Sequence, residues 1–334
     1  MAERNEPRVV TLREVAAEAG VSVSTVSRVL DERTPRSRSA TAQRVRETAE
    51  RLGYRRNAAA AGLRRGVTGT IGVLVPRLTD AVMALMFEAL ERAARHRGAF
   101  AVVATCGDEA EDEQRATETL LDRGVDGLVL ATARLDDALP ASLRARHIPH
   151  ALVIRTDRVS PASLSDDDLG GYLAVRHLLD LGHRSIGIVT GPAFTSTACD
   201  RRTGAERALA EAGLPAPSER VLATSYGVEA GITAGRQLLE REDRPTAVFA
   251  ANDNLAIGVL TAARTLGLNT TGELSIVGYN DIPLASRLPV PLTSVHTPFD
   301  QIATTSLDLL FSGGQGQHRA LPTLIPRAST ATPS

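Results

Sequence analysis

The run TLREVAAEAGVSVSTVSRVL near the N-terminus constrains the fold more than any other stretch of this sequence. Thr11, with Glu14 three positions later, has the pattern of a capping box, and apolar residues then recur at helical spacing up to Gly20. Ser22 suits the N-cap of a second helix. Two short helices joined by a glycine turn make a helix-turn-helix, whose second helix can enter the major groove of DNA.

Charge is distributed unevenly along the chain. Residues 1–66 hold 14 arginines against 8 acidic residues, a net charge of +6, whereas the remainder holds 24 arginines against 31 acidic residues, a net charge of −7. A basic segment on an acidic body indicates a polyanionic partner for that segment alone. A third predicted helix, from about Ser39 to Leu52, completes a small helical domain. The alternative is a helical hairpin whose polar residues are merely solvated.

The second helix of this motif carries the side chains that would contact DNA. Its first turns would face the base edges, where a methyl group meets thymine, a hydroxyl donates or accepts, and a guanidinium binds guanine with two hydrogen bonds. Hydroxyls near the helix start suit phosphate oxygens. We therefore expect base contacts from Val23, Ser24 and Arg28, and phosphate contacts from Ser22, Thr25 and Ser27.

After Gly69 the pattern changes to short apolar runs separated by helical stretches rich in Ala, Leu, Glu and Arg. The predicted strands are residues 70–75, 99–104, 127–130, 151–154, 185–189, 247–251 and 274–278. This alternation predicts an α/β fold with parallel sheets and helices on both faces. Two such units, meeting near residue 165, would leave a cleft, and ligands of open α/β sheets bind at the carboxyl ends of the strands.

The composition favours a cytoplasmic protein with no membrane contact. The two cysteines, Cys106 and Cys199, lie far apart, which fits a reducing compartment. The segment MAERNEPRVV lacks the apolar core of a signal peptide. No stretch approaches the roughly 20 apolar residues of a membrane span.

No catalytic, cofactor or metal-binding motif is recognisable in the sequence. It lacks G-x-S-x-G, G-x-G-x-x-G, a Walker loop and H-E-x-x-H, so we expect no enzyme, no catalytic residues and no cofactor. Residues 166–168, three aspartates, fit the start of a helix better than a metal site, and His183 fits a structural turn. Two alternatives remain open: an enzyme on the same α/β fold, or a small-molecule-binding protein that acts without DNA.

The helix-turn-helix run, the third helix ending in RLGY, and the segments GHRSIGIVTG, AANDNLAIG, SIVGYND and PLTSV closely resemble the LacI/GalR family of regulators over nearly the whole chain. The resemblance implies a repressor that binds a palindromic operator in double-stranded DNA as a homodimer. It implies control by a small polar effector, such as a sugar or related metabolite. It also implies a periplasmic-binding-protein-like (type I) core of two subdomains behind the all-α headpiece.

The same resemblance divides the chain into parts. These are a headpiece (1–56), a hinge helix with linker (57–69) and an effector-binding and dimerisation core (70–334), the core comprising subdomain one (about 70–164 plus 296–316) and subdomain two (about 165–292 plus 319–328). In the hinge, the resemblance implies that Asn57 contacts DNA and that Leu63 wedges into the minor groove. The sequence departs from the family pattern here, with Arg56, Ala61 and Gly62 in place of the usual proline, arginine and serine.

Single positions of the core match ligand-binding positions of the family. Arg201 matches a ligand-gripping arginine, and Asn252 matches a ligand-contacting asparagine. Tyr226 falls where some sugar-binding members place an aromatic ring. Asn280 stands where many members have an aspartate, which removes a negatively charged hydrogen-bond acceptor.

Two further arginines follow predicted strands of the core. Arg77 comes after the first strand, and Arg155 comes after the fourth, where some family members have an acidic residue. Together with Arg201 they would make the cleft cationic, which indicates an anionic or highly polar ligand. The alternative is that Arg77 and Arg155 are solvated residues at the rim.

Overall fold

The computed structural model describes most of the chain, and the described ranges are residues 10–31, 37–54, 67–214, 218–270 and 272–333. The chain divides into two compact units, Met1–Thr68 and Gly69–Ser334. None of the helices in these described ranges is long and apolar enough to cross a membrane.

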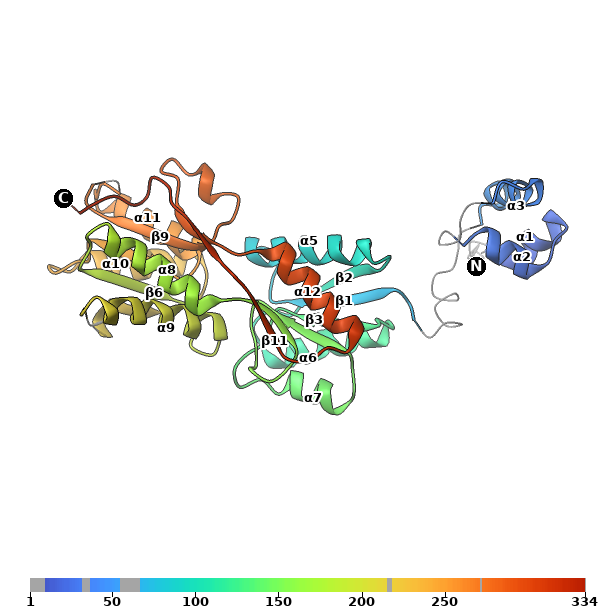
Figure 1. Ribbon diagram of the computed structural model, residues 1–334, viewed down its shortest axis with the longest axis horizontal. Coiled ribbons are helices and arrows are strands. Elements are labelled where there is room, and N and C mark those ends of the chain that lie inside the picture. The colour runs from blue at the N-terminus through green and yellow to red at the C-terminus, as the bar shows by residue number, and fades with distance from the viewer. Residues whose placement is uncertain (1–9, 32–36, 55–66, 215–217, 271, 334) are drawn as a thin grey trace, which may run out of the picture. The chain divides into compact units, whose positions relative to one another are not determined.

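The first unit is a small helical domain. Its described helices are α1 (Leu12–Ala19), α2 (Val23–Val29) and α3 (Ala40–Arg51), seen in blue in Figure 1. One residue from each helix, Val15, Val26 and Val45, is fully excluded from solvent at the centre. Because this core is small, each of these valines contributes a large share of the apolar area that the unit buries.

The predicted helix ends of the first unit are confirmed. The backbone amide of Glu14 donates to Thr11 Oγ1 at 3.3 Å, and the amide of Thr11 donates to Glu14 Oε2 at 2.8 Å, which completes the capping box. Gly20 ends α1 with a φ of 65°, a left-handed conformation that glycine adopts without steric cost. Ser22 and Ser39 cap the next two helices.

The second unit contains two six-stranded sheets in the described part of the chain. The first sheet has the spatial order β11 (Gln317–Ala320), β5 (Ala162–Ser165), β4 (His150–Val153), β3 (Gly127–Leu130), β1 (Thr70–Val75) and β2 (Phe100–Thr105). The second has the order β12 (Thr323–Ile325), β10 (Thr293–His296), β9 (Ser275–Asn280), β8 (Ala247–Ala250), β6 (Ile186–Thr190) and β7 (Val221–Ala223). Neighbouring strands are parallel except for β10 and β12.

Helices cover both faces of each sheet (Figure 1). On the first sheet, α5 (Ala81–His96) and α12 (Phe299–Ser312) share one face, and α6 (Ala110–Asp122) and α7 (Leu139–Ala145) share the other. On the second, α8 (Asp167–Asp180) pairs with α9 (Ser196–Glu211), and α10 (Val228–Leu239) pairs with α11 (Asp253–Thr265). Short 3₁₀ turns cover Ser218–Arg220 and Ala285–Arg287. Each sheet with its helices forms one lobe, and the predicted α/β fold is confirmed.

All seven predicted strands are present, with ends within two residues of the prediction. Strands β5, β7, β10, β11 and β12 were not predicted. They have three or four residues each, and several carry polar side chains, so no apolar run marks them.

The chain crosses between the lobes three times, after β5, after β10 and after β11. This corrects the sequence-based division of the core at two places. Arg319 and Ala320 pair with β5 in the first sheet, although the sequence placed 319–328 in the second subdomain. His296 ends β10 in the second sheet, although the sequence placed it in the first. The sequence-based division already contained the third crossing, but the polar segment QHRA of β11 has no apolar pattern that marks its position.

Two glycines let α8 and α9 pack with their backbones in contact. A Cβ on Gly204 would overlap the carbonyl oxygen of Asp168, and a Cβ on Gly171 would overlap the carbonyl oxygen of Arg201. Larger residues would force these helices apart. The close approach brings Arg201 of α9 beside Asp167 of α8.

Candidate functional site

The N-terminal turn of α2 presents a cluster of hydroxyl groups. The Ser22 Oγ accepts from the Thr25 amide at 3.2 Å. It also lies 2.9 Å from Ser24 Oγ and 2.8 Å from Thr25 Oγ1. These hydrogen bonds hold three hydroxyls at the positive end of the helix dipole, where phosphate oxygens bind favourably.

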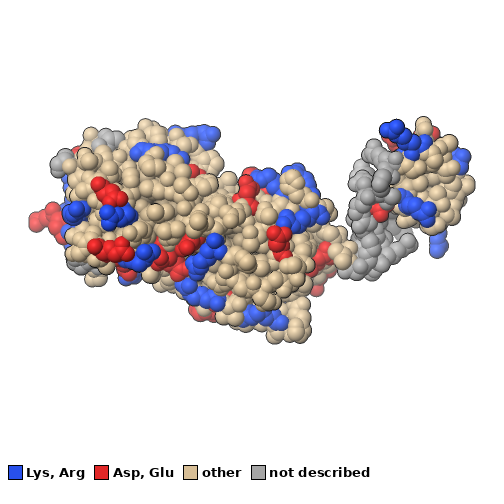
Figure 2. Space-filling model, in the orientation of Figure 1, with Lys and Arg blue, Asp and Glu red and all other residues tan. Residues whose placement is uncertain are grey.

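The six DNA-contact residues predicted on α2 differ in exposure. The side chains of Ser22, Ser24, Ser27 and Arg28 are exposed, whereas those of Val23 and Thr25 are half-buried. Val23 packs against the headpiece core, so only part of it faces outward. Arg28 forms no ion pair with any described residue. Figure 2 shows several basic side chains on the surface of this unit.

The predicted hinge residues cannot be placed in this description. Asn57 and Leu63, together with Arg56, Ala61 and Gly62, lie outside the described residues. Their assignment to the DNA contact stays a prediction.

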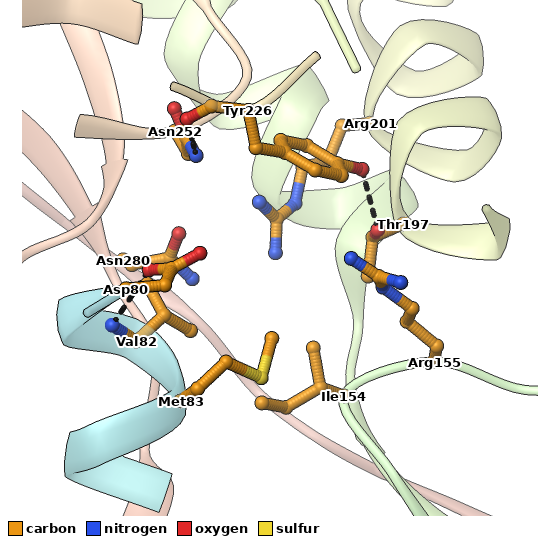
Figure 3. A pocket seen from close by; sticks show the side chains of 10 residues that line it. All are labelled: Asp80, Val82, Met83, Ile154, Arg155, Thr197, Arg201, Tyr226, Asn252 and Asn280. Carbon is orange, nitrogen blue, oxygen red and sulfur yellow. Dashed lines mark hydrogen bonds between the residues drawn. The ribbon is translucent and has the colours of Figure 1, made fainter. Parts of the chain in front are cut away.

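A deep pocket lies where the two lobes of the second unit meet, with about 300 Å³ of unfilled space, part of it open to solvent (Figure 3). Its lining residues come from both lobes and are Asp80, Val82, Met83, Ile154, Arg155, Thr197, Arg201, Tyr226, Asn252 and Asn280. Five of the six predicted effector residues are in this set, and the sixth, Arg77, is not. Convergent polar side chains beside apolar ones are typical of sites for small metabolites.

Arg201 is fixed at the back of the pocket by a buried ion pair. Its side chain is among the buried polar groups, and its Nε donates to Asp167 Oδ1 at 2.7 Å. Its Nη1 donates to the carbonyl of Ala251 at 2.6 Å, and its guanidinium carbon lies 3.6 Å from the ring centroid of Tyr279. Burial is the largest single influence and lowers the pKa of Arg201, but Asp167, Tyr279 and Tyr226 together outweigh it and raise the pKa above its ordinary value.

This pairing refines the expectation for the three consecutive aspartates. Asp166 is the N-cap of α8 and accepts from the Leu169 amide at 3.1 Å, as expected. Asp167 is buried and binds Arg201, which capping alone did not predict.

Asn252 and Tyr226 hold each other in place. Asn252 caps α11 through a 2.8 Å hydrogen bond from the Leu255 amide, and its Nδ2 donates to the Tyr226 carbonyl at 3.1 Å. The hydroxyl of Tyr226 lies 2.8 Å from Thr195 Oγ1 and 2.9 Å from Thr197 Oγ1. The aromatic ring is left to form one wall of the pocket (Figure 3).

Asn280 closes the pocket at the carboxyl end of β9. It has a φ of 97°, and the next residue, Asp281, has a φ of 54°. Asn280 Nδ2 donates to Thr297 Oγ1 at 3.2 Å, and Asp281 forms an ion pair with Arg327 at 2.7 Å. Positive φ at two non-glycine residues is strained backbone, which is typical of ligand-binding loops.

The two remaining predicted arginines occupy different environments. Arg155 follows Ile154, whose φ is 65°, and its side chain is only 8% exposed. It is therefore not a solvated rim residue. Arg77 is exposed and forms an ion pair with Asp108 at the mouth of the cleft.

Sequence analysis missed several pocket residues of the first lobe. Asp80 caps α5 by accepting from the Val82 amide at 3.0 Å, and burial raises the pKa of its carboxyl. An acidic residue between a strand and a helix is a recognisable cap, so Asp80 could have been found. Met83 and Ile154 have no sequence signal that separates them from ordinary core residues.

Asp253 lies buried behind the pocket at the start of α11. Ser294 Oγ donates to its Oδ1 at 2.6 Å, and the Ile282 amide donates to its Oδ2 at 2.8 Å. Burial raises the pKa of this carboxyl to about 7, with a smaller contribution from the charge of Asp281.

The described residues contain no group of three or more His, Cys, Asp or Glu side chains that could hold a metal ion. His183, which the sequence predicted to be structural, contacts Thr246 Oγ1 at 2.9 Å and Ser275 Oγ at 3.0 Å. This histidine joins the turn before β6 to two neighbouring segments of the second lobe.

Comparisons with known proteins match both units. Residues 11–57 match the model described as bacterial regulatory proteins, lacI family, and residues 175–330 match a periplasmic binding protein-like domain. The chain is 32% identical to catabolite control protein A of Priestia megaterium, covering 90% of this chain and 91% of that one. It is 33% identical to the ribose operon repressor of Escherichia coli (strain K12), covering 97% of each.

Solved structures show the same similarity. The structure of the Lac repressor dimer bound to operator and the anti-inducer ONPF superimposes with a TM-score of 0.87 at 27% sequence identity. The match covers 97% of this chain and 100% of that one.

Proposed function

The chain belongs to the LacI family of bacterial transcriptional regulators. We propose that it acts as a homodimeric repressor, and that a small effector in the interlobe pocket sets its affinity for a palindromic operator. Regulation of transcription through a helix-turn-helix follows from the family itself. The dimer, the operator symmetry and the effector are our proposals for this chain. They are supported by the operator-bound Lac repressor dimer, to which the chain is similar over nearly its whole length.

The exposed face of α2 is the proposed base-reading surface. Arg28 would bind guanine through two hydrogen bonds, Ser24 would contact a base edge, and the exposed part of Val23 would contact a thymine methyl. The hydroxyls of Ser22, Thr25 and Ser27 would bind phosphates and fix the position of the helix on the duplex.

We further propose that the segment after the headpiece contacts the operator centre, with Asn57 on the DNA and Leu63 wedged into the minor groove. An apolar wedge unstacks a base step and bends the duplex. Gly62 lowers the helix propensity of this segment by roughly 1 kcal/mol relative to alanine. We therefore expect a weaker hinge helix than an alanine at position 62 would give.

The observation that carries the effector proposal is that one pocket joins both lobes. Arg201, Tyr226, Asn252 and Asn280 come from the second lobe, and Arg155 comes from the first. A ligand held by both would favour one relative orientation of the lobes. In a dimer, that orientation would set the spacing of the two hinge segments and hence their fit to the operator.

We propose that the pocket binds its ligand without transforming it and needs no cofactor, and that the protein works in the cytoplasm. The ribose operon repressor and the Lac repressor are regulators with the same organisation along the chain, which supports a binding role over an enzymatic one. The alternative of a DNA-independent binding protein is opposed by the basic headpiece.

The test combines selection of DNA with a screen of compounds. Full-length protein is used to capture fragments of genomic DNA, and the enriched sequence is tested by gel shift with and without small sugars and their acidic derivatives. The proposal predicts a palindromic consensus bound by two protomers and at least one compound that changes the affinity about 5- to 150-fold. Enrichment without a palindrome, or affinity unaffected by every compound, would contradict it.

A further inference from the structure

Arg155 lies at the junction of three connected spaces in the core. It lines the deep pocket, a side pocket between the ends of the first-lobe strands, and the open mouth of the cleft. The side pocket has about 270 Å³ of unfilled space and also contains Glu113, Thr132 and Arg134. A ligand in any of the three spaces would meet the guanidinium of Arg155.

Arg155 is 8% exposed, lines the pocket space and forms no ion pair with a described carboxylate. Its side chain forms no hydrogen bond and no ion pair with any described residue. The guanidinium carbon lies 5.5 Å from the centroid of the Tyr226 ring. Arg201 of the same pocket, in contrast, is paired with Asp167. Because no described side chain pairs with this charge, Arg155 is available to an anion that enters the pocket.

The carboxyl groups near Arg155 do not take this role. Asp80 already accepts from the Val82 amide as the cap of α5. Glu113 feels the charge of Arg155 but forms no ion pair with it among the described residues. Burial raises the pKa of both carboxyls, and the charge of Arg155 opposes this shift in each.

The side pocket offers unused hydrogen-bond acceptors. Glu113 and Thr132 are 5% and 6% exposed, and neither Glu113 Oε1 nor Thr132 Oγ1 has a hydrogen-bond partner among the described residues. The Thr132 hydroxyl lies near enough to Glu113 to lower the pKa of its carboxyl, and both atoms retain capacity for a hydrogen bond to a ligand. Hydroxyl groups can both donate to the Glu113 carboxylate and accept from the Thr132 hydroxyl.

We infer that the effector is a polyhydroxylated organic anion whose carboxylate or phosphate group binds Arg155 and whose hydroxyl groups reach Glu113 and Thr132. The inference rests on the proposed function, since it assigns a chemical class to the effector of the same cleft. A planar guanidinium matches a carboxylate or phosphate with two parallel hydrogen bonds. A neutral sugar would fill the space but leave Arg155 unpaired.

The test measures direct binding to the full-length protein by calorimetry. The probes are pentoses and hexoses, each as the neutral sugar, the corresponding sugar acid and the sugar phosphate, together with inorganic phosphate. We expect the tightest probe to be anionic and to bind about tenfold or more tightly than its neutral counterpart. A neutral probe that binds as tightly as any anion, or no binding by any anion, would overturn the inference.

Variants separate Arg155 from the general charge of the cleft. Arg155→Gln should weaken the tightest anion about tenfold or more, and Arg155→Lys, which keeps the charge but not the planar fork, should recover part of the loss. Arg77→Gln, at the mouth and already paired with Asp108, should change the affinity less than about threefold. Equal losses in Arg77→Gln and Arg155→Gln would contradict a specific role for Arg155.

The side pocket is tested by Glu113→Gln and Thr132→Val. Both should weaken the hydroxylated anions about threefold or more, and neither should weaken inorganic phosphate, since phosphate alone does not extend to these groups. Unchanged binding of the hydroxylated anions would remove the side pocket from the inference.

Different results would contradict the proposed function and the inference that the effector is an anion. If the tightest compound is neutral and still alters operator binding, the anion inference is wrong and the proposed function stands. If an anion binds through Arg155 but operator affinity does not change, the proposed coupling to DNA is wrong.

Discussion

The exposed face of α2 and the interlobe pocket are built in opposite ways. Ser24, Ser27 and Arg28 project from α2 into solvent, and Arg28 has no partner among the described residues. Arg201 and Asn252 of the pocket are buried, and each is fixed by two hydrogen bonds. A DNA surface can leave its side chains free because the phosphates position the protein. A pocket for a small ligand gains affinity when its groups are already ordered.

This difference predicts that substitutions in the DNA-binding face and in the pocket have different effects on the free energy of unfolding. The exposed residues Ser27 and Arg28 of α2 contribute little to folding, so substitutions of these two should affect DNA binding alone. Pocket residues also hold α8, α9 and α11 together, so substitutions there should affect both ligand binding and stability. The predictions below run from the largest expected effect to the smallest.

Arg201→Ala should cause the largest loss. It leaves Asp167 buried without its partner, which should lower the free energy of unfolding of the core by about 3–5 kcal/mol. It should also abolish the response of operator binding to effector. Urea unfolding followed by circular dichroism measures the first effect.

Arg207→Ala is the matched control on the same pair of helices. Arg207 forms an exposed ion pair with Asp168, so its loss should cost less than about 1 kcal/mol. If Arg201→Ala is no less stable than Arg207→Ala, the buried pair does not organise the pocket.

Asp253→Asn tests whether buried ionisable groups of the core create a pH dependence. The folded carboxyl takes up a proton below about pH 7, whereas the unfolded one does so only below about pH 4. The folded state therefore binds more protons between these values, and the stability from this group falls as pH rises through that window.

Relative to wild type, Asp253→Asn should thus gain stability between pH 5 and pH 8, by an amount on the order of a few kcal/mol. Urea unfolding of both proteins across that range measures the difference. A difference that stays constant with pH would show that Asp253 is ionised throughout.

Arg28→Ala tests the exposed DNA-binding face of α2. It should weaken specific operator binding by about 1–3 kcal/mol and leave both stability and effector binding unchanged. Gel-shift titration on operator and on random DNA separates the two kinds of binding. Equal losses on both DNAs would assign Arg28 to a phosphate instead of a base.

The smallest effect on operator affinity is expected for substitutions in the predicted hinge segment, which follows the headpiece in the sequence. Gly62→Ala should tighten operator binding by at most about 1 kcal/mol, because alanine favours a helix. Leu63→Ala should reduce the DNA bend, measured by circular permutation of the binding site. An unchanged bend in the Leu63 variant would argue against a wedge.

The sequence predicted those elements that have strong local signals. The capping box of Thr11 and Glu14 and the apolar strand β1 depend on neighbouring residues alone, and both are present as predicted. Strand β11 is polar and short, and its pairing with β5 depends on the fold of the whole core. No window of sequence contains that information.

The sequence indicated several residues of the pocket, but not the hydrogen bonds and ion pairs that connect them. Arg201 and Asn252, which family resemblance singled out, line the pocket, while their partners Asp167 and the Tyr226 carbonyl are known only from the packing of helices and loops. The contrast between a paired Arg201 and an unpaired Arg155 likewise depends on burial, which sequence does not give.

The central claim is that the pocket and the DNA-binding surface are coupled, and reciprocity tests it most directly. The affinity for the effector identified in the screen is measured by calorimetry with and without saturating operator DNA, and the operator affinity is measured with and without that effector. Linkage requires both ratios to equal the same factor, which we expect to lie between about 5 and 150. An effector affinity that does not change when operator is bound would contradict the account.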